Sequence, residues 1–354
     1  MNDCGNHLSE TKVTGAGNDA LCLASWPRHQ VKLASLVLVT AVAAAWLVSA
    51  GHHRPLETQS ASHLELPWIK PAIEAPNSCR HVFFSPAART NVSYLLYLPP
   101  DYVRDDSRRY PVLYWLHGTG YGLIGVPEFV QHLDQAIRDG RAPAMIGVFV
   151  NGLTHSRYLD SKDGQAPVES MFIHDLIPHI DGAYRTLAYR EGRIIEGFSM
   201  GGEGAARLGL KYPEIFGAIS VVAGAFPNLE NVLKFQGSVF HEVYGDDFYY
   251  LLENNPRHFA EINSYQISGH TVMRIVVGTA DNLCRINHAF HIRLQHLGID
   301  NDFEELDGVA HDHTAIYAAL GEKNWDFYWE AVKQGQPLPE PMTARDVDDE
   351  GDGL

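Results

Sequence analysis

One serine in this sequence has the neighbours that a nucleophile needs. Ser199 lies between Gly197 and Gly201, after the apolar run "RIIEGF" and before "MGGEGAARLGLKYP", a stretch rich in small residues. A strand, a sharp turn and a helix in this order form a nucleophile elbow, and its strained turn requires small residues two positions before and after the serine. The pattern predicts a serine nucleophile for acyl transfer. The alternative is a serine without chemistry in a glycine-rich loop.

A serine hydroxyl is a weak nucleophile, so a base and an acid must accompany it. In elbow architectures both follow the serine along the chain, the acid first and then a histidine. Asp281 ends the predicted strand "MRIVVGTAD", at the sheet edge where catalytic groups gather, although an aspartate there would also cap the next helix. His311 follows the last predicted strand, "DFEELDG". His311 is the predicted base, and His313 is the alternative.

Acyl transfer also requires hydrogen-bond donors for the charge that develops on the carbonyl oxygen. The N–H of Met200, directly after the serine, is the first predicted donor. The second is the N–H of Thr119 in "VLYWLHGTG", a loop after an early strand, for which a plain turn is the alternative. His117 would then orient this loop. Such a site needs no metal or cofactor. We interpret His288 and His291 as a solvated helix face, because no carboxylate lies in the same turn.

The elements that must hold these residues alternate between short apolar runs and helical stretches, from about Cys79 to Gly335. The predicted strands are "SYLLYLPP", "YPVLYWLHG", "AMIGVFVNG", "RIIEGFS", "GAISVVAGA", "MRIVVGTAD" and "DFEELDG", and the predicted helices include "VPEFVQHLDQAIRDG", "ESMFIHDLIPHIDGAYR" and "CRINHAFHIRLQHLG". This alternation predicts an α/β protein with a mostly parallel central sheet and helices on both faces. The carboxyl ends of the strands would bring the serine, the aspartate and the histidine to one edge.

Several of these segments together resemble the esterase D / feruloyl esterase-like family of α/β-hydrolases. That family also contains acetylxylan esterases, siderophore esterases, S-formylglutathione hydrolases and the antigen 85 mycolyltransferases. The resemblance extends over about residues 94–317 and rests on "PVLYWLHGTG", "EGFSMGGEGAARLGLKYPEIFGAIS", "VVGTADNL" and "LGIDNDFEELDGVAHDH". It implies the α/β-hydrolase fold and a triad of Ser199, Asp281 and His311. His313 stands where the family often has an aromatic residue.

The expected activity is that of a serine esterase, which hydrolyses carboxylic esters through a Ser-His-Asp triad and an acyl-enzyme. Two alternatives are an acyltransferase of the antigen 85 type, in which an alcohol replaces water, and a non-catalytic α/β-hydrolase scaffold. We expect a small-molecule or carbohydrate-linked ester as substrate. Tyr158 and Phe226 lie in loops near the predicted site and are candidate substrate contacts, although core or plain surface positions are equally consistent with the sequence.

The composition is that of a globular protein and limits the partners. The chain has 354 residues, of which 45% are apolar and 20% are charged, and its formal net charge is −16. We do not expect it to bind nucleic acid, because phosphate recognition requires clustered Lys and Arg. The four cysteines show no CxxC spacing. In an exported protein Cys79 and Cys284 could form a disulfide, and two free buried thiols are the alternative.

An uncharged apolar run covers residues 33–50, directly after Arg28 and Lys32. We interpret it as a signal peptide cleaved near Ala50 or as an uncleaved anchor that associates the protein with a membrane; a buried core helix is the third interpretation. Either of the first two would place the rest of the chain outside the cytoplasm, as a secreted, periplasmic or membrane-anchored protein.

The chain accordingly divides into four predicted parts that follow its changes in composition. These are the signal or anchor segment 1–51, a linker 52–77 rich in Pro, His, Ser and Glu, the α/β-hydrolase catalytic domain 78–336, and an acidic disordered tail 337–354.

Overall fold

The computed structural model describes residues 67–104, 106–120, 125–227, 232, 234 and 237–333. The predicted signal or anchor segment, residues 52–66 of the predicted linker and the predicted tail lie outside these ranges. Within the described ranges, no helix is long and apolar enough to cross a membrane. The apolar run 33–50 is not among the described residues.

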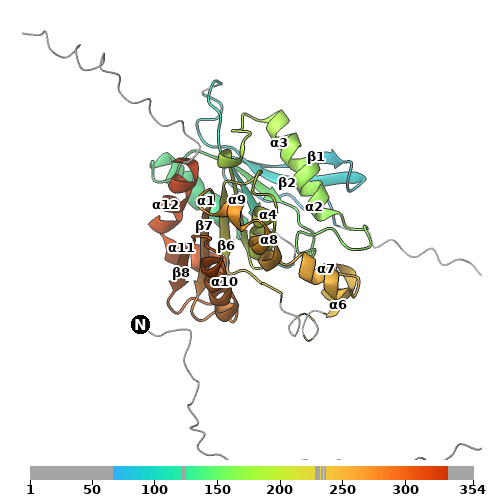
Figure 1. Ribbon diagram of the computed structural model, residues 1–354. Helices are drawn as coiled ribbons and strands as arrows, with labels where there is room; N and C mark the ends of the chain where they lie inside the picture. The colour runs from blue at the N-terminus through green and yellow to red at the C-terminus, as the bar shows by residue number, and fades with distance from the viewer. Residues whose placement is uncertain are drawn as a thin grey trace, which may run out of the picture. The chain divides into compact units, whose positions relative to one another are not determined.

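Eight strands form a single sheet in the order β1-β2-β4-β3-β5-β6-β7-β8 (Figure 1). The strands are β1 (Ser78–Ser85), β2 (Thr90–Tyr97), β3 (Val112–Leu116), β4 (Ile146–Val150), β5 (Arg193–Phe198), β6 (Ala218–Val222), β7 (Val272–Gly278) and β8 (Asp302–Leu306). β1 pairs antiparallel with β2, and β2 pairs antiparallel with β4. All pairs from β4 to β8 are parallel. The predicted mostly parallel sheet is confirmed.

Helices cover both faces of this sheet. They are α1 (Val126–Arg138), α2 (Val168–Ser170), α3 (Ile177–Ala183), α4 (Met200–Lys211), α6 (Gly237–Glu242), α7 (Phe248–Glu253), α8 (Pro256–Ile262), α9 (Ser264–Ile267), α10 (Cys284–His296), α11 (His313–Leu320) and α12 (Glu322–Lys333), with π-helical residues Met171–Leu176 joining α2 to α3. Phe129 of α1 and Tyr328 of α12 pack with Trp115 on one face. Leu208 of α4 and Leu294 of α10 belong with Tyr114 to the cluster on the other face.

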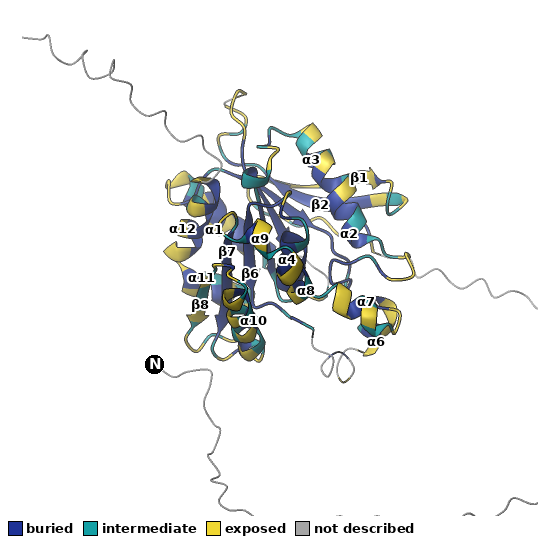
Figure 2. Cartoon of the chain, viewed as in Figure 1, coloured by how far each residue is buried: buried dark blue, intermediate teal, exposed yellow. Residues whose placement is uncertain are grey.

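The central strands are buried on both sides, which explains why they form continuous apolar runs. Every residue of β3, β4, β6 and β7 is buried, and Figure 2 shows the sheet in dark blue beneath partly exposed helices. Successive side chains of a strand point to opposite faces, so a strand covered on both faces is apolar at most positions. The buried polar exceptions Ser220 of β6 and Arg274 of β7 are hydrogen-bonded to each other. This core fixes the strand ends that carry the predicted site.

The helices α6 and α7 form a small insertion between β6 and α8. Phe240, Tyr244 and Leu251 of this insertion pack against Leu159 in an apolar cluster separate from the two sheet faces. Tyr250 Oη donates a hydrogen bond of 2.8 Å to the Asp160 carbonyl. The insertion is therefore tied to the loop that follows β4.

Cys79 and Cys284 do not form the disulfide that the sequence left open. Cys79 is an exposed free thiol in the edge strand β1, whereas Cys284 is a buried residue at the start of α10, which packs on β7. Six strand spacings of about 4.8 Å separate β1 from β7. Two Cys Cα atoms must approach within roughly 7 Å to be bridged, so the sheet itself keeps these two apart.

Candidate active site

Ser199 lies at the turn between β5 and α4, with the backbone angles φ 58° and ψ −114°. A positive φ is strained for any residue with a side chain. A Cβ placed on Gly197 would lie 2.2 Å from the Gly201 carbonyl oxygen, and one on Gly201 would lie 2.0 Å from the Leu116 carbonyl oxygen. Both flanking positions therefore require glycine. The predicted elbow geometry is confirmed.

The neighbouring strand holds this turn in place. The Ser199 N–H donates to the Val222 carbonyl at the end of β6, over 2.9 Å. The Ser199 carbonyl accepts from the Ala225 N–H, also over 2.9 Å. These bonds compensate for the strained backbone and fix the direction of the serine side chain.

The structure brings Ser199, Asp281 and His311 together. Nε2 of His311 lies 2.9 Å from Ser199 Oγ, and Nδ1 lies 2.6 Å from Asp281 Oδ2. With Nδ1–H donating to the carboxylate, Nε2 is left to accept from the serine hydroxyl. The Asp281 side chain is fully buried, and its second oxygen accepts from the Leu283 N–H over 2.8 Å. The aspartate thus has two roles, since it stabilises the turn that follows it and also orients the histidine ring.

The two candidate histidines lie in different surroundings. The ring of His311 packs on Phe198, with centroids 4.6 Å apart, and reaches the serine. The ring of His313 fills the space left by the missing side chain of Gly125, where a Cβ would lie 1.4 Å from its Nε2. Burial lowers the pKa of His313. His311, and not His313, therefore lies within hydrogen-bond distance of Ser199 Oγ.

The predicted oxyanion donors lie on the two segments that flank the serine. Met200 is the first residue of α4. A Cβ on Gly118 would lie 3.4 Å from the Ser199 Cβ, so the loop that carries Thr119 packs against the serine. Within the described part of the chain, neither the Met200 N–H nor the Thr119 N–H has a hydrogen-bond acceptor. Both groups are available to a substrate oxygen.

His117 fixes the loop after β3, as predicted. Its Nε2 accepts from the Gly152 N–H over 3.1 Å, and its Nδ1–H donates to the Gly118 carbonyl over 2.6 Å. Burial lowers the pKa of His117 to about 4. The ring is therefore neutral, and both nitrogens are used. It orients the loop and has no free nitrogen to act as a base.

The two predicted substrate contacts are buried in the protein, which corrects that assignment. Tyr158 is inaccessible to solvent, and its hydroxyl donates to the His117 carbonyl over 3.2 Å. Its ring also occupies the space beside Gly152 and Gly204. Phe226 is 5% exposed and packs on Phe290, with centroids 4.2 Å apart. Both side chains therefore lie in the protein interior, where they pack against the loops around the serine.

Sequence reasoning missed a buried ion pair under the elbow. Arg157, in the loop after β4, forms a salt bridge with Glu203 of α4, and both side chains are almost fully buried. Arg157 also donates over 2.6 Å to the carbonyl of Ala225, whose N–H holds the Ser199 carbonyl. Burial raises the pKa of Glu203 to about 7, against the lowering effect of Arg157 and Arg207. The letters "GGEGAA" carry no sign that the glutamate points into the core.

No group of three or more His, Cys, Asp or Glu side chains is arranged to hold a metal ion in the ranges that the structure describes. His288 Nδ1 lies 3.4 Å from Glu305, and His291 Nδ1 lies 2.7 Å from Asn301. These two histidines therefore contact different neighbours.

Comparison with known proteins places this geometry in a family. Residues 85–329 match the family model described as "Esterase: Putative esterase". The chain belongs to this esterase family. The match covers most of the described residues, from the end of β1 into α12, and it includes Ser199, Asp281 and His311. The family is one of carboxylic ester hydrolases, so the predicted resemblance is confirmed at this level.

Two curated relatives and one solved structure show the range of similarity. The chain is 35% identical over 137 residues to an endo-1,4-beta-xylanase/feruloyl esterase of Xylanibacter ruminicola, covering 36% of this chain and 19% of that protein. It is 25% identical over 270 residues to an acetyl esterase of Caldicellulosiruptor saccharolyticus, covering 70% and 91%. A ferulic acid esterase structure matches with a TM-score of 0.62 and 22% identity, covering 72% and 98%.

These matches differ in what they establish. The structural match confirms the α/β-hydrolase fold. The chain spans 19% and 28% of the length of the first curated relatives that it matches. The remaining parts of those relatives are not aligned with this chain.

Proposed function

We propose that this protein is a serine esterase that hydrolyses carboxylic esters through a covalent acyl-enzyme. The observation that carries the proposal is the hydrogen-bonded relay, 2.9 Å from Ser199 Oγ to His311 and 2.6 Å from His311 to the buried Asp281. Membership of the esterase family supports the same chemistry.

The proposed first step acylates the serine. His311 Nε2 accepts the Ser199 proton while Oγ forms a bond to the ester carbonyl carbon. Asp281 keeps Nδ1 protonated and stabilises the imidazolium. The N–H groups of Met200 and Thr119 bind the oxyanion of the tetrahedral intermediate. When this intermediate collapses, the bond to the alcohol oxygen breaks and His311 returns its proton to the leaving alcohol.

The proposed second step reverses these roles with water as the nucleophile. His311 takes a proton from water, whose oxygen attacks the acyl carbon. The same two N–H groups bind the second oxyanion. Collapse then breaks the bond to Ser199 Oγ, which recovers a proton from His311, and the carboxylic acid leaves. The residues of the chain supply every proton transfer.

Turnover of p-nitrophenyl acetate tests the proposal. Ser199→Ala should lower kcat by on the order of 10⁵ or more, because no oxygen is left to form the acyl-enzyme. Ser264→Ala, at the start of α9, is the matched control and should keep wild-type activity. His311→Ala and His313→Ala form a second pair, of which only the first should lose activity on the same scale. Equal turnover by the wild type and Ser199→Ala would refute the proposal.

The substrate is proposed from the relatives. Those relatives are named for feruloyl and acetyl esters, and we extend this to a small-molecule or carbohydrate-linked ester as the substrate of this protein. A panel of acetyl, butyryl and feruloyl esters would rank the acyl groups by kcat/KM. Product analysis with added sugar acceptors distinguishes hydrolysis from acyl transfer of the antigen 85 type, because only the transferase forms a new ester.

We also propose that residues 33–50 direct the catalytic domain, residues 78–336, out of the cytoplasm. The proposal rests on the uncharged apolar run and on Arg28 and Lys32 before it. Cell fractionation with N-terminal sequencing of the mature protein tests it. A mature chain that begins near Gly51 indicates cleavage, and an intact chain in the membrane fraction indicates an anchor. An intact chain in the cytosol contradicts both.

A further inference from the structure

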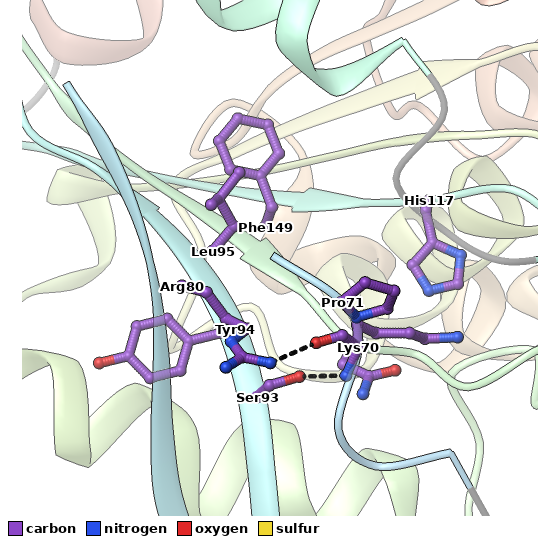
Figure 3. Close-up of a pocket in the computed structure, with 9 residues that line it drawn as sticks. Lys70, Pro71, Arg80, Ser93, Tyr94, Leu95, His117 and Phe149 are labelled. Carbon is purple, nitrogen blue, oxygen red and sulfur yellow. Dashed lines mark hydrogen bonds between the residues drawn. The ribbon is translucent and has the colours of Figure 1, made fainter. Parts of the chain in front are cut away.

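Lys70 is a buried lysine whose charge has no partner among the residues that the structure describes. The residue is 5% exposed, and its Nζ makes no hydrogen bond within the described part of the chain. Its backbone is held firmly, since its N–H donates to Ser93 Oγ over 2.7 Å and its carbonyl accepts from Arg80 over 3.0 Å (Figure 3). A buried ammonium is unfavourable unless an anion or hydrogen-bond acceptor replaces the lost water. Burial accordingly lowers the pKa of Lys70.

The pocket around this lysine contains positive charge and no carboxylate. It is lined by Lys70, Pro71, Arg80, Ser93, Tyr94, Leu95, His117, Phe149 and Asn151 (Figure 3). Two of these residues are cationic, and none of the residues that line the pocket is a carboxylate. The space is about that of one water molecule, so its occupant must be a water molecule or a single small ion.

The other polar groups of the pocket already have partners. Asn151 Nδ2 donates to the Trp68 carbonyl over 2.8 Å, and its Oδ1 accepts from the Leu153 N–H. Both ring nitrogens of His117 are used in the loop after β3. Among the buried donors of the pocket, the ammonium of Lys70 therefore lacks a hydrogen-bond acceptor in the described part of the chain. A water molecule would accept a hydrogen bond but would leave the charge uncompensated.

We propose that this pocket binds a single monatomic anion of the halide class, with Lys70 Nζ as its principal hydrogen-bond donor. The site is separate from the relay at Ser199. His117 lines the pocket and also holds the Gly118 carbonyl, so the bound anion stabilises the loop that carries Thr119. The proposal does not depend on the esterase activity, because it concerns binding to the folded protein.

Thermal unfolding of the full chain tests the site. Chloride should be raised from 1 to 500 mM against gluconate at constant ionic strength, since gluconate is too large for the pocket. For a dissociation constant of about 10 mM, Tm should rise by about 5 °C. Lys70→Met should abolish the rise, whereas Lys323→Met, which removes an exposed lysine of α12, should retain it. An equal rise in the wild type and Lys70→Met, or no rise in the wild type, overturns the proposal.

A direct measurement keeps the proposal testable even if Lys70→Met fails to fold. Wild-type crystals soaked in bromide should show an anomalous peak within hydrogen-bond distance of Lys70 Nζ. A pocket that holds only water, without an anomalous peak, overturns the proposal.

Discussion

At the scale of single residues, the strained backbone of Ser199 explains the composition around it. The residue has a positive φ because the chain must leave β5, expose one side chain and enter α4 within one peptide. Carbonyl groups pass within 2.2 Å of where side chains would begin at Gly197 and Gly201. Glycine is therefore demanded by contacts with the backbone, which cannot move aside.

Replacing one of these glycines should disrupt the elbow. We expect Gly201→Ala to lower the free energy of unfolding by about 3 kcal/mol and to abolish activity, because the new methyl group collides with the Leu116 and His117 carbonyls. Urea denaturation measures the first effect and ester turnover the second.

Gly182→Ala is the matched control for this prediction. Gly182 lies in α3 with open space around it, so alanine should raise the free energy of unfolding by roughly 0.5–1 kcal/mol. A Gly201→Ala protein with wild-type stability and turnover would contradict this account, because it would show that the turn at Ser199 accommodates a side chain at position 201.

Asp281 acts on the orientation and tautomer of His311. We expect Asp281→Asn to lower kcat by on the order of 10³–10⁴, because an amide favours the tautomer with the proton on Nε2, facing the serine. KM should change little, since the carboxylate is buried and out of reach of a substrate. Steady-state kinetics measures both quantities. A mutant that loses affinity while keeping kcat would contradict this role.

At the scale of elements, α4 connects several segments of the chain around the serine. Its first residue carries the Met200 N–H, and its third turn supplies Arg207, which donates to Glu169 over 2.5 Å. Its Glu203 pairs with Arg157, which holds the Ala225 carbonyl. The helix thus joins the loop after β4, the loop after β6 and the serine through buried charges.

Glu203 should make stability depend on pH. Its native pKa is raised to about 7, whereas an unfolded glutamate titrates near 4.3. The native state therefore binds more protons between these values. The stabilisation from protonated Glu203 is complete below about pH 4.3 and is lost as the pH rises through about 7, by about 4 kcal/mol in total.

Glu203→Gln should flatten this dependence, because glutamine cannot ionise. The free energy of unfolding from urea denaturation between pH 4.5 and 7.5 is the measurement. Glu214→Gln removes an exposed carboxylate just after α4 and serves as the control. Parallel pH profiles for the wild type and Glu203→Gln would rule out this titration.

The central strands β3, β4, β6 and β7 could be predicted because they are buried on both faces and form apolar runs. β1 was missed since it is an edge strand, with exposed Val82 and Phe84 alternating with buried Phe83. The burial of Tyr158 was also out of reach, because it depends on a loop packing beneath α4. Short-range sequence patterns do not contain that contact.

At the scale of the whole molecule, strand order explains why three distant residues meet. β5, β6, β7 and β8 are neighbours in the sheet in the same order as in the chain, and all are parallel. Their carboxyl ends therefore share one edge, where Ser199 follows β5, Asp281 follows β7 and His311 follows β8. The site could be predicted because this topology converts chain order into proximity.

The pocket at Lys70, in contrast, could not be predicted from the order of the strands. It forms where residues before β1 cross β2, with the Trp68 carbonyl accepting from the Ser93 N–H over 2.9 Å. The sequence before β1 is a Pro-rich stretch that we predicted as a linker, and nothing in it shows that a lysine would be buried. Contacts between the segment before β1 and the sheet arise from the complete fold.

The central claim is that Ser199 is a nucleophile activated by His311. Labelling with a fluorophosphonate, followed by mass spectrometry of the digested protein, tests it most directly. We predict one adduct, on the peptide that contains Ser199, with labelling at least 100-fold slower in His311→Ala and unchanged in His313→Ala. An adduct on any other residue, or labelling of His311→Ala at the wild-type rate, would contradict the account.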